Sequence, residues 1–330
     1  MSDDLAVLKE LLDENLTVRD PKGGEVLQVA LIATLYFRET YRREVREAVV
    51  ACCEDFFQRC GHKLRWALHP DSRYMEPYGD GKGSHPRTWL PDLGEEGSFS
   101  LIYHGAHHER GAGCPSLNGL GRELLLPRVT FGHLQFGFPL LWFSKNPGTF
   151  PDVVLEICRK LQPDSGYGGI GVIQSPDNGI SHRWEPVIYE LAQRFPGLEA
   201  DFPISHGNWL RQGREGGKSG IKGVNWLTVV ADRYLDELGG AARVEADVRA
   251  LDSRFIVHGW GGGLMIQAGE RPELGDAERD RWPELYVKLA KYLKPLRITQ
   301  HRPFGHAGPG PRFGNDSKEA LAWLRRFDDR

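Results

Sequence analysis

A glycine-rich stretch with a lysine and a serine is the first place to look for chemistry in this sequence. Residues 213–220 read GREGGKSG, and the Gly-Lys-Ser at 217–219 resembles the end of a phosphate-binding loop. Such a loop has another glycine five positions earlier, so that its backbone N–H groups can surround a phosphate. Position 212 is Gln212, and residues 220–230 are typical of a strand, whereas a phosphate-binding loop opens a helix. The stretch is therefore interpreted as a glycine-rich connection.

A second glycine pattern, GYGGIG at 166–171, matches the dinucleotide-binding sequence G-x-G-x-x-G. In a dinucleotide site these glycines follow a strand and open a helix. Here the order is reversed, because a helical pattern precedes them and a strand pattern follows. We expect a turn between a helix and a strand at this position.

Three histidines are the best candidates for a metal site. His104, His107 and His108 lie in the sequence HGAHHER together with Glu109, and these side chains could reach one ion. A metal centre also needs ligands on a fixed face. This run instead leads from a strand into a glycine-rich loop, without a clear distant carboxylate. A metal-dependent hydrolase with a dispersed site near these histidines stays open as an alternative.

Two further patterns contain carboxylates. The segment 151–160, PDVVLEICRK, is similar to a metal-dependent nuclease sequence, but its spacing from Glu156 to Lys160 is wrong and its pattern is helical. Glu-Pro pairs at 76–77 and 185–186 are interpreted as structural turns or helix starts. Since no pattern completes a catalytic set, the sequence predicts no catalytic, cofactor-binding or metal-binding residues.

The composition is that of an ordinary soluble globular chain. Of 330 residues, 40% are hydrophobic and 26% charged, and the formal net charge is −3. This balance gives no reason to expect nucleic acid or an anionic membrane as a partner. The chain start lacks the features of a signal peptide, and no stretch approaches the ~20 apolar residues of a membrane span. Five cysteines without a disulfide spacing indicate reduced thiols in the cytoplasm.

The first part of the chain alternates strand and helix patterns. In its helical segment, Val49 and Phe56 are expected to face inward and Arg46 to face outward. The elements expected here are a buried strand at 26–37, a helix at 42–60, strands at 63–70 and 98–105, and a long loop at 71–96.

The same layout returns further along the chain. A strand is expected at 139–143, a helix at 151–161 and a strand at 170–178. An offset of 106 positions aligns the two sets and pairs Cys52 with Cys158. The sequence therefore predicts an internal strand–helix–strand repeat. The two repeat units are about 31–72 and 137–178.

A third unit, about 220–298, follows. Its expected elements are a strand at 224–230, a helical region at 231–249, a hairpin of strands at 254–260 and 262–269, and a helix at 279–293. After a loop at 301–315, a short helix is expected at 316–327. The pattern predicts an α/β or α+β fold, with mixed sheets covered by helices.

Several segments together resemble the immunity proteins of the type VI secretion system that protect bacteria from nuclease toxins. The similarity runs from about residue 26 to about 298. The Gly-x-Lys-Gly-x-Asn-Trp-Leu run and the Gln-Ala-Gly…Leu-Gly-Asp run are its most specific parts. The segments that carry it are LYFRETYRREVREAV (35–49), LRWALHPD (64–71), LAQRFPGLEADFP (191–203), GIKGVNWLTVVADRYLDELGG (220–240) and IQAGERPELGD (266–276).

The resemblance implies a protein that is not an enzyme. It implies that the chain binds a cognate toxin in the cytoplasm and blocks the toxin's active site or substrate groove, with no catalytic residues and no cofactor. It also suggests an organisation into an acidic helical extension at 1–25, an immunity domain at 26–298, and a C-terminal loop and helix at 299–330.

The loop at 71–96 is the candidate surface for the toxin. A nuclease presents a basic groove to phosphates, so an inhibitor that covers the groove benefits from carboxylates, and aromatic side chains can anchor the contact. A protein-interaction module without a toxin partner is the other alternative. The candidate partner-binding residues are Tyr74, Tyr78, Trp89, Asp92, Glu95 and Glu96.

Overall fold

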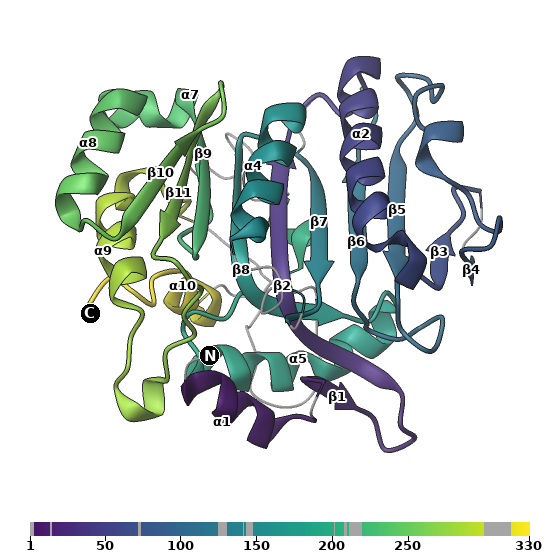
Figure 1. Cartoon of the computed structure of the whole chain (residues 1–330), viewed down its shortest axis with the longest axis horizontal. Helices are drawn as coiled ribbons and strands as arrows, with labels where there is room; N and C mark the ends of the chain where they lie inside the picture. Colours follow the sequence, from purple (N-terminus) through teal and green to yellow (C-terminus); the bar gives the residue numbers. More distant parts are fainter. Residues whose placement is uncertain are drawn as a thin grey trace.

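One continuous sheet runs through the molecule and carries helices on both faces (Figure 1). The computed structural model describes residues 3–13, 15–71, 74–124, 131–140, 142, 148–200, 202–207, 210, 220–299 and 318–330. The strands are β1 Thr17–Arg19, β2 Glu25–Phe37, β3 Trp66–Leu68, β4 Met75–Pro77, β5 Phe99–His104, β6 Ser116–Gly121, β7 Gly132–Phe138, β8 Ser165–Gln174, β9 Leu227–Ala231, β10 Phe255–Gly259 and β11 Gly263–Ala268. The helices are α1 Asp3–Leu11, α2 Arg43–Cys60, α4 Thr149–Leu161, α5 Asn178–Arg194, α6 Pro203–Gly207, α7 Asp232–Leu235, α8 Ala241–Leu251, α9 Glu284–Tyr292 and α10 Lys318–Leu324.

The sheet has eleven strands, and its order is β10-β11-β9-β8-β2-β7-β6-β5-β3-β4, with β1 pairing onto β2. Each pair of neighbouring strands is antiparallel. The predicted α+β class with helix-covered strands is confirmed, but the strands form one antiparallel sheet instead of the expected mixed sheets. The position of β2 at the centre of the sheet explains its long apolar run. The strand is flanked by β7 and β8 and covered on both faces, so none of its sides contacts water.

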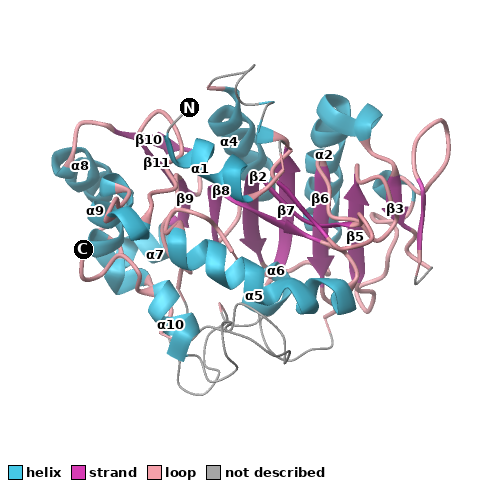
Figure 2. Cartoon of the chain, turned by 90° about the horizontal axis from the view of Figure 1, so that it is seen from below, coloured by secondary structure: helices cyan, strands magenta, loops and turns pink. Residues whose placement is uncertain are grey.

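One face of the sheet is apolar and lies under α2 and α4 (Figure 2). Phe56 of α2 packs against Phe136 and Phe138 of β7, with ring centroids 5.6 Å and 5.4 Å apart. Cys52 and Cys158 are fully buried where the two helices meet. Burial of such side chains is the main stabilising term of the fold.

The opposite face, under α5 and α6, carries a row of polar side chains instead. The strand register places Asn118, Gln135, Thr34 and Tyr167 side by side on four neighbouring strands. The Gln135 Nε2 donates a hydrogen bond to the Thr34 Oγ1 at 3.0 Å. Because paired residues of an antiparallel sheet share a face, this row follows directly from the register.

At the other end of the sheet, β10 and β11 form the predicted hairpin, and α8 and α9 cover it. Gly261 in the turn has φ +95°, a left-handed conformation that suits glycine. The helix expected at 279–293 is shorter and spans Glu284–Tyr292.

Three predicted elements are wrong. The segment 71–96, expected to be a long loop, contains the short strand β4. The strand expected at 139–143 lies earlier, at β7, which ends at Phe138, and Leu140 and Trp142 are helical. The GYGGIG stretch is not a turn but part of β8. A Cβ atom at Gly166 or Gly171 would lie only 2.5 Å or 2.3 Å from the side chain of Leu35 or Ile32 on β2, so these glycines make room for larger neighbours.

The Glu-Pro pairs also differ from their interpretation. Glu76 and Pro77 lie within the short strand β4, and Glu185 and Pro186 lie inside α5. Neither pair forms a turn or begins a helix. A proline is tolerated in β4 because one side of the strand has no neighbour in the sheet.

The two proposed repeat units share an element order but not every detail. The helix α2 begins at Arg43 and α4 at Thr149, 106 positions later, and a strand lies on each side of both helices. A common origin of the two units stays a prediction. The proposed boundary after residue 25 falls at the start of β2, where β1 already pairs with it.

Candidate functional site

A buried arginine holds the part of the 71–96 loop that carries its three candidate carboxylates. The Arg46 side chain is 1% exposed and its guanidinium donates hydrogen bonds only to backbone carbonyls: Thr40 at 3.1 Å, Gly94 at 3.0 Å, Gly97 at 2.9 Å, and Leu93. Burial lowers the pKa of Arg46 from its usual value. Residues 92–97, here named the acidic turn, are thereby fixed to the start of α2.

The expectation that Arg46 faces outward is therefore wrong. A signal for its burial is present in the sequence, since Arg46, Val49, Cys53, Phe56 and Cys60 follow one another at spacings of three and four residues. The pattern was ambiguous because a charged residue is seldom fully buried unless its donors find partners. Three of those four partners lie about fifty positions away in the chain.

The three carboxylates of the acidic turn point to the surface. Asp92 is 78% exposed and only 3.9 Å from Arg43, and Glu95 and Glu96 are exposed as well. The whole segment 71–96 has six acidic and three basic residues, so its net charge of −3 favours a basic partner surface.

The three aromatic candidates divide into two kinds. The Tyr74 side chain is 80% exposed. Tyr78 is half-buried, and its ring lies 5.8 Å from that of Phe57 and 5.1 Å from that of Tyr103. Trp89 also packs against the core, and its Nε1 atom is buried. Tyr74 can therefore present most of its ring to a partner, while Tyr78 and Trp89 support the loop from beneath.

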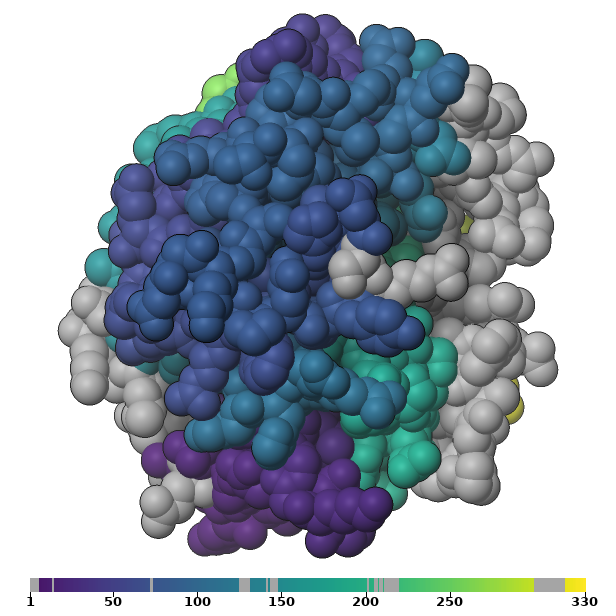
Figure 3. Space-filling view, turned by 90° about the vertical axis from the view of Figure 1, so that its right-hand side faces the viewer, coloured from purple at the N-terminus to yellow at the C-terminus, as the bar shows by residue number. Residues whose placement is uncertain are grey.

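Figure 3 shows the side of the molecule on which the segment that carries these residues lies. The blue segments between residues 60 and 110 cover most of this face, and the purple β1–β2 hairpin and the teal-green start of α5 border it. The loop between β5 and β6 joins these neighbours, because Arg110 forms an ion pair with Asp177 and His107 one with Glu25.

The three histidines considered for a metal do not converge. The His104 side chain is 3% exposed, and its Nε2 lies 3.1 Å from the Glu109 carbonyl oxygen. The His107 Nδ1 instead lies 2.8 Å from the Glu25 carboxylate, and His108 is exposed. Across the described ranges, no three metal-binding side chains come together. The histidine run therefore offers no metal centre there.

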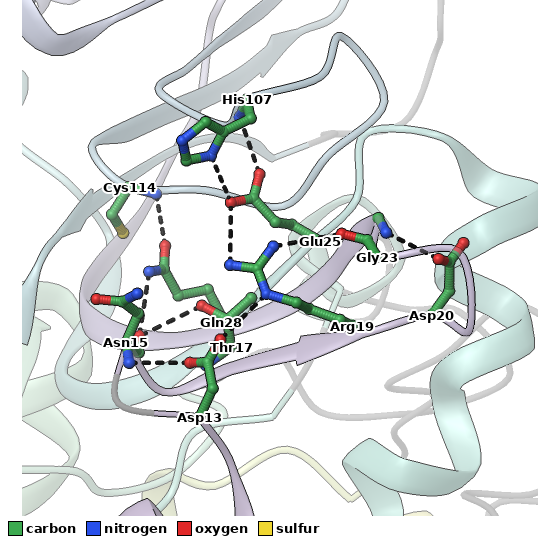
Figure 4. A network of polar contacts seen from close by, with 11 residues as sticks. Asp13, Asn15, Thr17, Arg19, Asp20, Gly23, Glu25, Gln28, His107 and Cys114 are labelled. Carbon is green, nitrogen blue, oxygen red and sulfur yellow. Dashed lines mark hydrogen bonds and ion pairs between the residues drawn. The ribbon is translucent and has the colours of Figure 1, made fainter.

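Glu25 is the centre of a polar network that joins the N-terminal hairpin to the β5–β6 loop (Figure 4). It accepts hydrogen bonds from the backbone and the ring of His107, and Arg19 lies 3.6 Å from it. Burial alone would raise the pKa of Glu25, but the hydrogen bonds and charge of His107, together with Arg19, lower it below its usual value. The Ala112 N–H donates to the Glu25 carbonyl, so the loop is held at two points.

The two most specific sequence runs have structural roles. Lys222 of the first run is 5% exposed, forms an ion pair with buried Glu199, and lies 4.5 Å and 4.6 Å from the ring centroids of Tyr167 and Trp323. Asn225 donates to the other oxygen of Glu199. The Gly-Lys-Ser at 217–219 lies outside the described residues.

In the second run, Asp276 is fully buried with three arginines around it. The guanidinium groups of Arg194, Arg279 and Arg281 lie 3.6 Å, 3.5 Å and 3.8 Å from its carboxylate. A buried charge needs such partners, so substitution at these positions is expected to disturb the fold before it disturbs binding. No sequence-predicted partner residue lies in either run.

The fold has a counterpart among solved structures. The structure described as Pseudomonas aeruginosa T6SS protein PA0821 is similar, with a TM-score of 0.85 and 24% sequence identity. The match covers 99% of this chain and 91% of that chain. A search of curated proteins found no significant match.

The sequence model of one protein family matches residues 48–327 of the chain. The family is described as type VI immunity for VRR-NUC. The matched range begins inside α2 and continues to the C-terminal side of α10, so it includes the acidic turn, both specific runs and most of the sheet. The chain therefore belongs to the family of type VI immunity proteins for VRR-NUC.

Proposed function

We propose that this protein binds a VRR-NUC nuclease toxin one to one in the cytoplasm and covers its active site or substrate groove. It acts as an inhibitor and not as an enzyme. The observation that supports this mechanism best is the exposed acidic turn, because a buried arginine holds it in one conformation before any partner arrives. A loop ordered in advance loses little conformational entropy on binding.

Charge gives the physical reason for this mode of binding. A nuclease attracts the phosphates of its substrate with lysine and arginine, and carboxylates can take the place of those phosphates. Asp92, Glu95 and Glu96 are the carboxylates placed for such a contact, and Tyr74, elsewhere in the same 71–96 segment, supplies an exposed aromatic ring. In the described part of the chain, no helix has the length and apolar character to cross a membrane.

The test is a titration of the cognate VRR-NUC nuclease toxin with the purified protein. Residual DNA cleavage should fall linearly and reach zero at a fixed molar ratio, with or without a chelator in the preincubation of the inhibitor. A matched titration with an unrelated VRR-NUC nuclease controls for removal of DNA. Inactivation of many toxin molecules by one molecule of this protein would contradict stoichiometric binding and indicate an enzyme.

A further inference from the structure

A cavity of about 260 Å³ lies on the polar face of the sheet. Its floor is formed by β5, β6 and β7, and its walls by the start of α5 and by residues 202–204 at α6. The polar residues that line it include Ser100, Ser116, Asn118, Gln135, Gln174 and Asn178.

The lining is polar but carries no charge. Hydroxyl and amide groups lie next to apolar side chains such as Ile102, Ile173 and Phe202, and none of the described lining residues is Asp, Glu, Lys or Arg. Moving an ion into such a site without a counter-charge is strongly unfavourable. The cavity therefore suits an uncharged occupant that can exchange hydrogen bonds with hydroxyls and amides.

One nitrogen atom of a lining residue has no hydrogen-bond partner among the described residues. The buried His104 imidazole has its Nε2 against the Glu109 carbonyl, which can only accept, so Nε2 carries the proton. The Nδ1 is then an acceptor, and it has no partner among the described residues. Burial lowers the pKa of His104 to about 4, so the ring is neutral at physiological pH. A hydroxyl or amide N–H is the kind of donor that this acceptor requires.

We propose that this cavity receives one uncharged, hydrogen-bonding side chain of the toxin, from an asparagine, glutamine, serine, threonine or tyrosine. This inference rests on the proposed function and adds a second contact to it. The cavity is smaller than the roughly 300–1,000 Å³ of sites that enclose a whole small ligand. Hot-spot residues of protein interfaces typically place one side chain in a pocket of the partner.

The cavity wall is held firmly enough for that role. Gly111 and Gly113 of the wall belong to the β5–β6 loop, which the Glu25 network fastens to the N-terminal hairpin (Figure 4). The Ser175 hydroxyl donates to the Arg110 carbonyl at 2.7 Å and accepts from the Asp177 N–H at 3.0 Å. The loop, the hairpin and the start of α5 thus form one connected rim.

The experiment blocks the cavity mouth. Asn178 is exposed at the first residue of α5, and Asn178→Trp places a large ring there without opening the core. Gln193→Trp is the matched control, because Gln193 is an exposed amide on the same helix, about 20 Å further along. Ser100→Trp fills the cavity from within, and Ser253→Trp is its control, because Ser253 is an exposed serine beside β10 at the opposite end of the sheet. Thermal unfolding shows that each variant is folded.

We expect Asn178→Trp to raise the Kd for the nuclease at least about 30-fold, the size of an interface hot spot. The change should lie in the dissociation rate and persist at high salt, because no charge is involved. Gln193→Trp should stay within about threefold of the unsubstituted protein. If both folded cavity variants bind like their controls, the cavity proposal is wrong while the inhibitor model stands. If the unsubstituted protein itself fails to inhibit, the proposed function is wrong.

Discussion

The two faces of the sheet are built from the same strands, but their side chains differ in character. On the face under α2 and α4, β7 carries Leu134, Phe136 and Phe138, and the two phenylalanine rings pack against Phe56. On the other face, the alternate residues His133 and Gln135 are polar, and a cavity remains open. The apolar face is closely packed with large rings, whereas the polar face combines buried apolar side chains such as Ile32 and Ile173 with hydrogen-bonded polar ones and leaves a cavity open.

Neighbouring residues of β7 give the sharpest test of this contrast. Phe136→Ala should lower the free energy of unfolding by about 4 kcal/mol, because it truncates a fully buried ring. Gln135→Ala, one residue earlier and on the other face, should cost about 1 kcal/mol, mainly the hydrogen bond to Thr34. Chemical denaturation of both variants measures the difference. Equal losses of unfolding free energy at the two positions would contradict the difference in packing between the two faces.

A smaller effect is expected for the thiols of the apolar face. Cys53 and Cys158 are fully buried on α2 and α4, and burial raises the pKa of both thiols well above the usual value, so neither is a reactive thiolate. Cys→Ala at either position should lower the unfolding free energy on the order of 1 kcal/mol and leave toxin inhibition unchanged. Inhibition and denaturation are measured on the same samples. A stable variant that no longer inhibits would point to thiol chemistry instead of packing.

The acidic turn should have the smallest effect on stability, and its effect should lie in binding kinetics. Glu95→Lys with Glu96→Lys changes two exposed side chains, so the unfolding free energy should move by less than about 0.5 kcal/mol. The association rate with the nuclease should fall, most strongly at low salt, because steering by charge is screened by ions. Glu190→Lys with Glu270→Lys is the control, since it makes the same charge change at exposed positions elsewhere. Stopped-flow measurement of the association rate at two salt concentrations distinguishes the two double variants.

The same experiment can be combined with the blocked cavity. If the acidic turn steers and the cavity anchors, the reversed charges slow association, and Asn178→Trp speeds dissociation. Their effects on the Kd should then add, as they do for sites without shared contacts. If the combined variant loses much less binding free energy than the sum of the two separate losses, the two regions do not act as separate parts of one interface.

Much of the fold could be predicted because it depends on patterns of residues that are close together in the sequence. The apolar run at β2, the helical spacing of α2 and α4, and the glycine turn between β10 and β11 each occupy their predicted places within a few residues. The partner residues were chosen on weaker grounds, since exposed and supporting aromatics look alike in a sequence. Only the structure separates Tyr74, which is mostly exposed, from Tyr78, which packs against Phe57.

The sequence by itself determined the α+β class, the helices of the apolar face and the family resemblance, because each depends on residues that are close together in the chain. Tertiary structure alone decided the position of GYGGIG in β8, the hold of Arg46 on the acidic turn, and the polar row that joins Thr34 to Asn118 and Gln135. The physical reason is that strand register and buried hydrogen bonds couple residues far apart in sequence. Neither is set until the large side chains of neighbouring strands have packed against one another.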